Sequence, residues 1–377
     1  MKLRRKLIGI LLAGTMVMGM GASVMAAPAT GVEDSPAGVD IVKNLQMADG
    51  ITTPDVTFTF DFAKVTSDAP DINDAEIVYT SADKDSDVQN GLAEIQKSTG
   101  NILENVTFPH AGIFTYTVTE NGTDAVGYGM NYSEASYTMN VYVKNNDAGT
   151  GVYVYSVEIL KTTNDDGTSA GNTKEEDPTP GSGEEAGMLF TNVYTSGGGS
   201  TDPDADALTI SKTVAGEYGD KTKDFTFSVT LTKAATVSGA TAAYQGKIGT
   251  ETIDFITGTP REIQLHDGEC LVFEDLPAGT TYTVTETGTE GYTPSASVVE
   301  NGGEAVVTPG TEGQALSVEN NLVGTGANST AFTNTYDAAG EITPTGIIIN
   351  NLPFILLIVV AAAGIAFYVV SRRRFNR

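Results

Sequence analysis

The sequence predicts an all-β protein that contains two tandem β-sandwich domains. Short segments such as VTFTFDF, IFTYTVTE, SYTMNVYV and FTFSVTL alternate apolar residues with threonine or other polar residues, which is the period of a half-buried strand. The motif YTVTE occurs twice, at Tyr116–Glu120 and at Tyr282–Glu286. The two copies are much farther apart than the repeats of a solenoid, which indicates duplicated domains.

The two ends of the chain are predicted to be targeting segments. Residues 1–26 begin with four basic residues, continue through an apolar stretch and end in small residues, as in a secretory signal peptide. Residues 347–370 are predicted to span a membrane, because they contain the almost unbroken apolar run Leu352–Val370, which is long enough to cross it. The basic tail, residues 371–377, then lies on the cytoplasmic side by the positive-inside rule. We therefore expect an exported protein whose precursor is held in the membrane.

Composition divides the rest of the chain into two domains, at residues 33–196 and 207–337. Between them, residues 197–206 are rich in glycine, serine, aspartate and proline without periodicity, which predicts a linker. A short helix is expected near residues 88–95, because Val88, Leu92 and Ile95 share a helical face.

Charge and cysteine content restrict the function. The formal net charge is −27, and all 48 acidic residues lie between the two targeting segments, which hold eight of the 21 basic residues. Such an acidic surface excludes nucleic acid and anionic lipid as partners. Cys270 is the only cysteine and has apolar flanks, so it is expected to be a buried small side chain. An extracellular protein without disulfides needs another source of stability.

In each half, one lysine, one glutamate and one asparagine occupy strand positions on the same face as the apolar residues, which is the face expected to be buried. An isolated buried charge costs several kcal/mol, so such groups are normally paired or neutralised. One interpretation is an ion pair beside a hydrogen-bonded asparagine, and the other is a reactive set. The residues are Lys43, Glu120 and Asn192 in the first half and Lys212, Glu286 and Asn334 in the second.

Recurrence of the three residue types at matched strand positions in both halves favours the reactive interpretation, which makes use of their burial. Desolvation lowers the pKa of a lysine and raises the pKa of a glutamate, so both groups approach neutrality near pH 7. A neutral amine can attack the carboxamide carbon while a protonated glutamate polarises the amide and moves protons as ammonia leaves. Contact between the partners supplies a large effective molarity, so a single slow turnover is enough. The product would be an amide crosslink, worth roughly 5 kcal/mol, between the first and last strands of each half.

These trios, with YTVTE and FTNTY, resemble the intramolecular isopeptide-bonded pilin domains of Gram-positive surface proteins. The likeness is greatest to two-domain shaft (backbone) pilins of the streptococcal type, whose domains are Ig-like, CnaB-type sandwiches. The segment YTVTETGTEGY also resembles the pilin E-box, shortened by one residue before its final Gly-Tyr. The resemblance implies that the lysine and asparagine of each trio are joined and that the glutamate is the catalyst.

Residues 342–346, ITPTG, are similar to the sortase sorting signals of pilins. The resemblance implies cleavage between Thr345 and Gly346 and transfer of Thr345 to an amine of another subunit. Isoleucine and threonine stand where the commonest signal has leucine and proline, which leaves the sortase class open. No Tyr-Pro-Lys pilin motif is present, so Lys161 and Lys174 are candidate polymerisation lysines, and each is equally well an ordinary solvated lysine.

We therefore expect a structural shaft pilin on the cell surface, in the pilus or cell wall. Its expected partners are sortase, further copies of the chain and peptidoglycan, while a tip adhesin and minor pilins stay open. The alternative is a singly wall-anchored stalk or adhesin with the same crosslinked domains. We expect no cofactor or metal and no enzyme acting on an external substrate: the acidic segment Asp83–Gly91 lacks the glutamate of an EF-hand, and no Cys/His cluster is visible.

Overall fold

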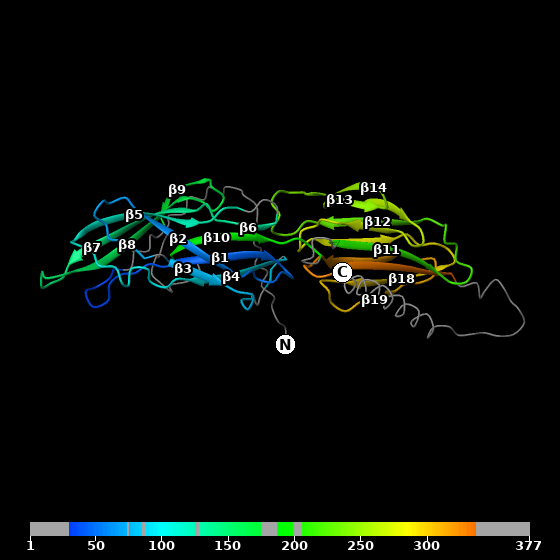
Figure 1. Cartoon of the computed structure of the whole chain (residues 1–377), viewed down its shortest axis with the longest axis horizontal. Helices are drawn as coiled ribbons and strands as arrows, with labels where there is room; N and C mark the ends of the chain where they lie inside the picture. Colours follow the sequence, from blue (N-terminus) through cyan, green and yellow to red (C-terminus); the bar gives the residue numbers. More distant parts are fainter. Residues whose placement is uncertain are drawn as a thin grey trace, which may run out of the picture.

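Every regular element in the described part of the chain is a β-strand, which confirms the predicted fold class. The structure is a computed structural model (Figure 1), in which the strands form two elongated bodies, β1–β10 in one and β11–β21 in the other. It describes residues 30–73, 75–84, 88–89, 91–124, 128–174, 187–199 and 206–336.

The predicted signal peptide, sorting signal, membrane-spanning segment and basic tail all lie outside the described residues. Among the residues that the structure does describe, no helix is long and apolar enough to cross a membrane.

The N-terminal body packs a four-stranded sheet, in the order β4-β1-β10-β6, against a six-stranded sheet, in the order β3-β2-β5-β7-β8-β9. Strands β1 and β10, the first and last of this body, are parallel neighbours, and the other pairs are antiparallel. The strands are β1 Ile41–Ala48, β2 Val56–Lys64, β3 Ala75–Tyr79, β4 Leu92–Ser98, β5 Gly112–Asn121, β6 Gly129–Asn131, β7 Ser136–Asn145, β8 Val152–Thr163, β9 Ser169–Lys174 and β10 Met188–Thr195.

The C-terminal body repeats this plan with a seven-stranded sheet, β14-β13-β16-β11-β21-β18-β19, and a four-stranded sheet, β15-β12-β17-β20. Its first and last strands, β11 and β21, are again parallel neighbours. The strands are β11 Leu208–Ala215, β12 Phe225–Thr232, β13 Ala243–Ile248, β14 Glu251–Ile256, β15 Arg261–Leu265, β16 Cys270–Phe273, β17 Thr281–Glu286, β18 Tyr292–Val299, β19 Val306–Pro309, β20 Leu316–Leu322 and β21 Ser329–Tyr336.

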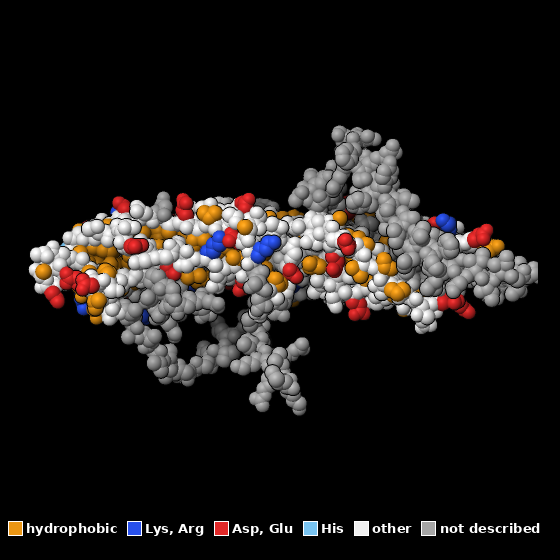
Figure 2. All heavy atoms as spheres, turned by 90° about the horizontal axis from the view of Figure 1, so that it is seen from below, with side chains coloured by type: hydrophobic (Ala, Val, Ile, Leu, Met, Phe, Trp, Pro, Cys, Tyr) orange, Lys and Arg blue, Asp and Glu red, His pale blue; other side chains and the backbone are white. Residues whose placement is uncertain are grey.

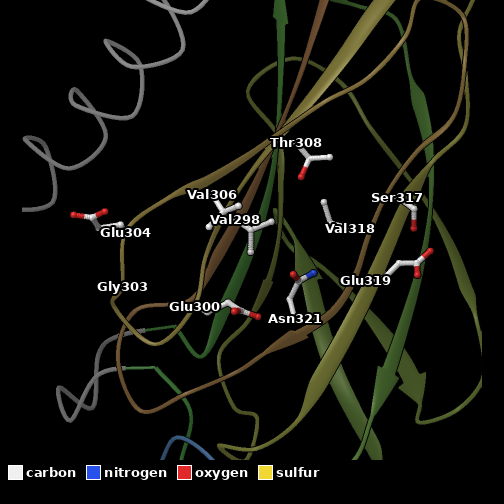
Figure 3. A pocket seen from close by; sticks show the side chains of 10 residues that line it. All are labelled: Val298, Glu300, Gly303, Glu304, Val306, Thr308, Ser317, Val318, Glu319 and Asn321. Carbon is white, nitrogen blue, oxygen red and sulfur yellow. The ribbon is translucent and has the colours of Figure 1, made fainter. Parts of the chain in front are cut away.

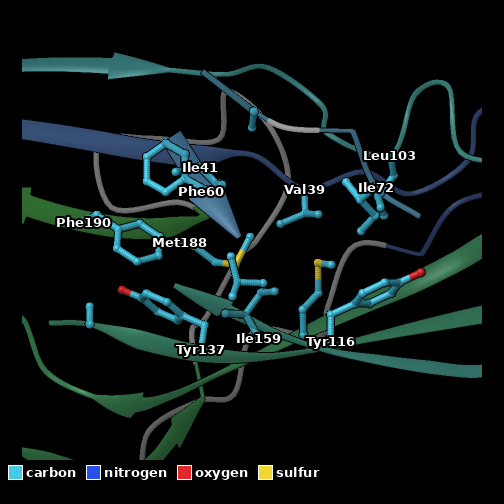
Figure 4. Packing of buried hydrophobic residues seen from close by; sticks show 14 of the residues in the cluster. Val39, Ile41, Phe60, Ile72, Leu103, Tyr116, Tyr137, Ile159, Met188 and Phe190 are labelled. Carbon is cyan, nitrogen blue, oxygen red and sulfur yellow. The ribbon is translucent and has the colours of Figure 1, made fainter. Parts of the chain in front are cut away.

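Aromatic rings fill the space between the two N-terminal sheets (Figure 4). The ring of Phe190 on β10 lies 5.0 Å from that of Phe60 on β2 and 5.2 Å from that of Tyr137 on β7. All three side chains are buried, because the alternation of each strand turns them to the same interior. This core fixes the distance between the sheets that carry the polar trio.

The helix predicted near residues 88–95 is wrong. Leu92–Ser98 forms strand β4, which pairs antiparallel with β1 and sets Ile95 opposite Leu45. A run this short fits a helical and an extended pattern equally, so its periodicity could not decide. Gly91, whose φ is 76°, turns the chain just before the strand. Pairing with the open edge of β1 then determines the conformation.

The segment predicted as a linker begins with hydrogen bonds to the C-terminal body. The amide of Gly198 donates to the carbonyl of Leu276 at 2.6 Å, and the amide of Ala278 donates to the carbonyl of Ser196 at 2.9 Å. A second contact joins Asn301 Nδ2 to the carbonyl of Gly50 at 3.3 Å. The connecting segment is therefore bound to the C-terminal body by backbone hydrogen bonds, and a contact from a side chain to the backbone joins the two bodies directly.

Acidic side chains are spread along the described surface of both bodies on the face shown in Figure 2. This distribution agrees with the formal net charge of −27 and gives no concentrated basic patch on that face. A face with this charge repels polyanions.

We expect Phe60→Ala to lower the free energy of unfolding of the N-terminal body by about 3–5 kcal/mol, because it leaves a cavity beside Phe190. Ile113→Ala on the neighbouring strand β5 is the control, since Ile113 is 54% exposed and its loss should change stability by at most about 0.5 kcal/mol. Urea unfolding of both variants measures the difference. Equal effects would contradict the assigned interior.

Candidate functional site: two buried lysine–glutamate–asparagine trios

The parallel pair β1 and β10 brings the first lysine and asparagine together. Residues two apart on a strand share a face, so Lys43 and Leu45 point to the same side of β1. In the register of the pair, Lys43 lies opposite Phe190 and Leu45 lies opposite Asn192. The amine and the carboxamide are therefore on the same face of adjacent strands, directed into the core.

Glu120 reaches this pair from β5 in the facing sheet. Lys43 Nζ lies 2.8 Å from its Oε1 and 2.9 Å from its Oε2. Asn192 Nδ2 donates to Oε1 at 3.0 Å. One carboxyl group therefore contacts both the amine and the amide nitrogen, and it does so between the two sheets.

The C-terminal body contains the same arrangement on β11, β17 and β21. Lys212 lies opposite Phe332 and Val214 lies opposite Asn334, so the register equals that of the first site. Lys212 Nζ is 2.6 Å from Glu286 Oε1, and Asn334 Nδ2 donates to the same oxygen at 2.7 Å. The structure thus brings together all six residues singled out in the sequence, in two separate trios.

Both trios are removed from solvent. The side chains of Lys43, Glu120 and Lys212 are 0% exposed and that of Glu286 is 1% exposed. Aromatic rings from the strand next to each glutamate cover the amines. The ring of Phe58 is 4.6 Å from Lys43 Nζ, and that of Phe225 is 4.0 Å from Lys212 Nζ.

Burial changes the protonation of these groups. Desolvation lowers the pKa of Lys43 and that of Lys212 to about 8, although the neighbouring carboxylates act in the opposite direction. The same desolvation raises the pKa of Glu120 and that of Glu286 against the attraction of the lysines. Each pair is thereby moved toward a neutral amine beside a neutral carboxylic acid.

This geometry is suited to amide exchange. A neutral primary amine is a nucleophile, and the carboxamide beside it carries a potential ammonia leaving group. The glutamate contacts both nitrogen atoms, so it can accept a proton from one and deliver a proton to the other. No diffusing substrate is required, because both reactants belong to the same folded domain.

One contact at the first site could not be found from the sequence. The backbone N–H of Ser133 donates to Asn192 Oδ1 at 2.7 Å and lies 3.3 Å from Glu120 Oε2. Every residue except proline carries such a group, so no residue type signals it. Among the described residues, nothing donates to the corresponding oxygen of Asn334.

The two candidate polymerisation lysines lie near each other, on neighbouring strands β8 and β9. Lys161 is paired with Asp165 at 3.1 Å, and its side chain is 17% exposed. Lys174 lies 3.4 Å from Glu158, and its side chain is 36% exposed. Thr345 and Gly346 lie outside the described residues.

A separate groove opens between β18, β19 and β20 of the C-terminal body (Figure 3). Glu300, Glu304 and Glu319 line it together with valine and threonine side chains, which disfavours an anionic ligand. No group of three or more potential metal-ligating side chains occurs in the part of the chain that the structure describes. The groove contains nothing comparable to the two trios.

The N-terminal and C-terminal bodies match two different domain families. Residues 39–195 match the Spy0128-like isopeptide containing domain. Residues 206–336 match a domain of unknown function, DUF7601.

Two curated proteins show the extent of the likeness. A pilin from Streptococcus pyogenes serotype M1 is 27% identical over 360 residues, which cover 89% of this chain and 91% of that protein. The pilus tip adhesin Cpa from Streptococcus pyogenes is 40% identical over 85 residues, but these cover 22% of this chain and 12% of the adhesin. The likeness to the pilin therefore extends over nearly the whole chain, whereas that to the adhesin is local.

A solved structure of the major pilin from Streptococcus pyogenes is 24% identical and covers 80% of this chain and 99% of that chain. Its TM-score is 0.34, which is too low to support an argument about individual residues.

We expect the amine of Lys43 to titrate near pH 8 in Asn192→Ala, a variant that retains the contact with Glu120 but has no carboxamide to attack. Lys212 should behave alike in Asn334→Ala, which provides the matched case in the other domain. Nuclear magnetic resonance of the lysine side chains measures both pKa values. A value near the ordinary 10.5 would show that burial does not control these amines.

Proposed function

We propose that the chain is a shaft pilin of the streptococcal type, that both its domains close an internal Lys–Asn isopeptide bond and that sortase then joins the subunits. The match of residues 39–195 to the Spy0128-like isopeptide containing domain and the likeness of nearly the whole chain to a streptococcal pilin support this proposal. The observation that carries this proposal is the glutamate that contacts both an amine and a carboxamide, twice, in equivalent registers. The protein is structural, and its only chemistry of its own is the single closure in each domain.

The closure follows from the contacts of the first trio. Lys43 Nζ attacks Cγ of Asn192 with its lone pair, and a carbon–nitrogen bond forms. Glu120 accepts the proton that the attacking amine must lose and delivers a proton to Nδ2, which leaves as ammonia. The products are one amide and one molecule of ammonia, so no cofactor or external reactant is needed. Lys212, Glu286 and Asn334 are proposed to react in the same way.

The position of the bonds suits a protein under tension. Each bond would connect the first and last strands of its domain, which are parallel neighbours. A force applied to the two ends of a domain would then load a covalent bond, and the strands between could not be separated. Each crosslink also restricts the unfolded chain, which stabilises the domain by about 5 kcal/mol.

For assembly, we propose Lys174 as the amine that receives the next subunit. Its side chain is twice as exposed as that of Lys161, at 36% against 17%, and its ion pair with Glu158 is longer. Lys161 is engaged with Asp165 inside the first body. Sortase would break the bond between Thr345 and Gly346 and join the carbonyl of Thr345 to Lys174 Nζ.

Export and anchoring complete the proposal. Residues 1–26 would direct secretion, and residues 347–370 with the basic tail would hold the precursor in the membrane until sortase acts. The last subunit would be joined to peptidoglycan, and a tip adhesin would be added by the same chemistry. The mature protein would then lie on the cell surface as part of a pilus.

We expect Glu120→Ala to lower the free energy of unfolding of the N-terminal domain by about 5 kcal/mol, because the crosslink does not form. Glu286→Ala should have the same effect on the C-terminal domain only. Differential scanning calorimetry, with each domain observed as its own transition, measures both. Glu262→Ala, which removes an exposed carboxylate from β15, is the control. A loss of no more than about 1 kcal/mol in both variants would contradict the crosslinks.

We expect Lys174→Arg to abolish the high-mass ladder of polymers in cells that contain the cognate sortase. Arginine retains the positive charge beside Glu158 but has no primary amine to accept Thr345. Lys161→Arg and Lys221→Arg, the latter at an exposed position of the C-terminal body, should leave the ladder intact. Denaturing gel electrophoresis of cell-wall extracts measures the result.

A ladder that persists in Lys174→Arg would reject this lysine. A wild-type protein that forms no ladder in a sortase-positive strain would instead favour the singly anchored stalk or adhesin.

A further inference from the structure

The two trios differ at the side-chain oxygen of the asparagine. Asn192 Oδ1 accepts a hydrogen bond from the backbone N–H of Ser133 at 2.7 Å. In the described part of the C-terminal domain, no group donates to Asn334 Oδ1, which is equally buried. At both sites Oε1 of the glutamate contacts the amine and the amide nitrogen. The second oxygen differs, since Lys43 also contacts Glu120 Oε2 whereas Glu286 Oε2 has no partner among the described residues. The donor to the asparagine oxygen is the difference that acts on the electrophile itself.

A donor at this position acts on the atom where charge develops. When an amine attacks a carboxamide carbon, the carbonyl electrons move to the oxygen, which becomes an oxyanion. Backbone N–H groups about 2.7–3.1 Å from that oxygen are the usual means of stabilising it. The bond from Ser133 also orients the amide of Asn192, because with Oδ1 on the N–H the nitrogen Nδ2 faces Glu120 at 3.0 Å.

Asp165 holds this donor next to the reacting strand. Ser133 lies between β6 and β7, and its Oγ donates to Asp165 Oδ1 at 2.6 Å. The same carboxylate oxygen accepts the backbone N–H of Thr191, the residue before Asn192, at 2.8 Å. Lys161 binds the other oxygen at 3.1 Å. One carboxylate therefore connects the segment that carries the donor to the strand that carries the electrophile.

We propose that the Ser133 N–H stabilises the oxyanion during closure of the Lys43–Asn192 bond and that Asp165 is a positioning residue for it. This inference rests on the proposed crosslink. In the step, Lys43 Nζ bonds to Cγ and gives a proton to Glu120, while the carbonyl electron pair moves to Oδ1 beside the Ser133 N–H. Glu120 then delivers a proton to Nδ2. The carbonyl is restored as the Cγ–Nδ2 bond breaks and ammonia leaves. The C-terminal site closes without this donor, so only the first site depends on Ser133 and Asp165.

The test follows ammonia loss at both sites in the same molecules. The full chain is made by cell-free translation, translation is stopped, and samples taken over time are digested and mapped by mass. Ser133→Pro removes the N–H itself and should slow the first closure about 100- to 1,000-fold. Asp165→Ala and Ser133→Ala keep the N–H but remove the hydrogen bond between Ser133 Oγ and Asp165 that positions it. These variants should slow the first closure by about tenfold or more.

Three controls separate positioning from folding. Closure at Lys212–Asn334 should keep its wild-type rate in every variant. Ser133→Thr retains the hydroxyl that binds Asp165, so the first closure should keep its wild-type rate in this variant. Protease resistance of the N-terminal domain, measured with Asn192→Ala added to block the bond, should show that Asp165→Ala and Ser133→Ala still fold.

The outcomes distinguish this inference from the proposed function. If the wild-type chain closes its first bond and Asp165→Ala and Ser133→Ala close it at the same rate, the positioning role is overturned and the crosslink stands. A rate that falls equally at both sites also overturns it. If the wild-type chain never loses ammonia at the first site, the crosslink and this inference fail together.

Discussion

The contact between a buried lysine amine and a buried glutamate carboxyl is the interaction on which both domains depend. Moving two charged groups out of water costs several kcal/mol for each ion, and an ordinary protein avoids this by replacing them with apolar residues. Here the cost recurs in both domains, beneath aromatic rings that exclude water. Burial lowers the pKa of the lysine and raises that of the glutamate, which makes a neutral amine beside a neutral acid more accessible than it would be in water. Conversion to an amide would remove the buried charges permanently.

The strand order brings the asparagine, the third member of each trio, next to the lysine. Because the first and last strands of each domain are parallel neighbours, a lysine near the start of the domain lies beside an asparagine near its end. The glutamate comes from the opposite sheet, so the trio can assemble only when both sheets have packed. Aromatic contacts such as that of Phe60 with Phe190 set the separation of these sheets. The proposed crosslink would therefore form only in a correctly folded domain.

The fold class and the six residues of the two trios could be predicted from the sequence, because the alternation of apolar and polar residues along a strand shows which face is buried. Lys43, Glu120 and Asn192 each interrupt an apolar row, and the recurrence in the second half marked them as a set. The conformation of the segment around Leu92 could not be predicted, because a short apolar run fits both a helical and an extended period. Pairing with β1 makes this segment a strand. The hydrogen bond from the Ser133 backbone N–H could not be predicted, because every residue except proline carries such a group. The role of Asp165 was equally hidden, because it depends on a turn that meets β10 in space and not in sequence.

The intact mass of the chain from Ala27 to Thr345, produced without any sortase, tests the central claim most directly. Closure of each bond expels one molecule of ammonia, so the account predicts a mass lower than the sequence mass by two ammonia molecules. The deficit should fall to one in Glu120→Ala and to one in Glu286→Ala. A folded wild-type protein with the full sequence mass would contradict the account, and the two trios would then be buried polar networks without a reaction.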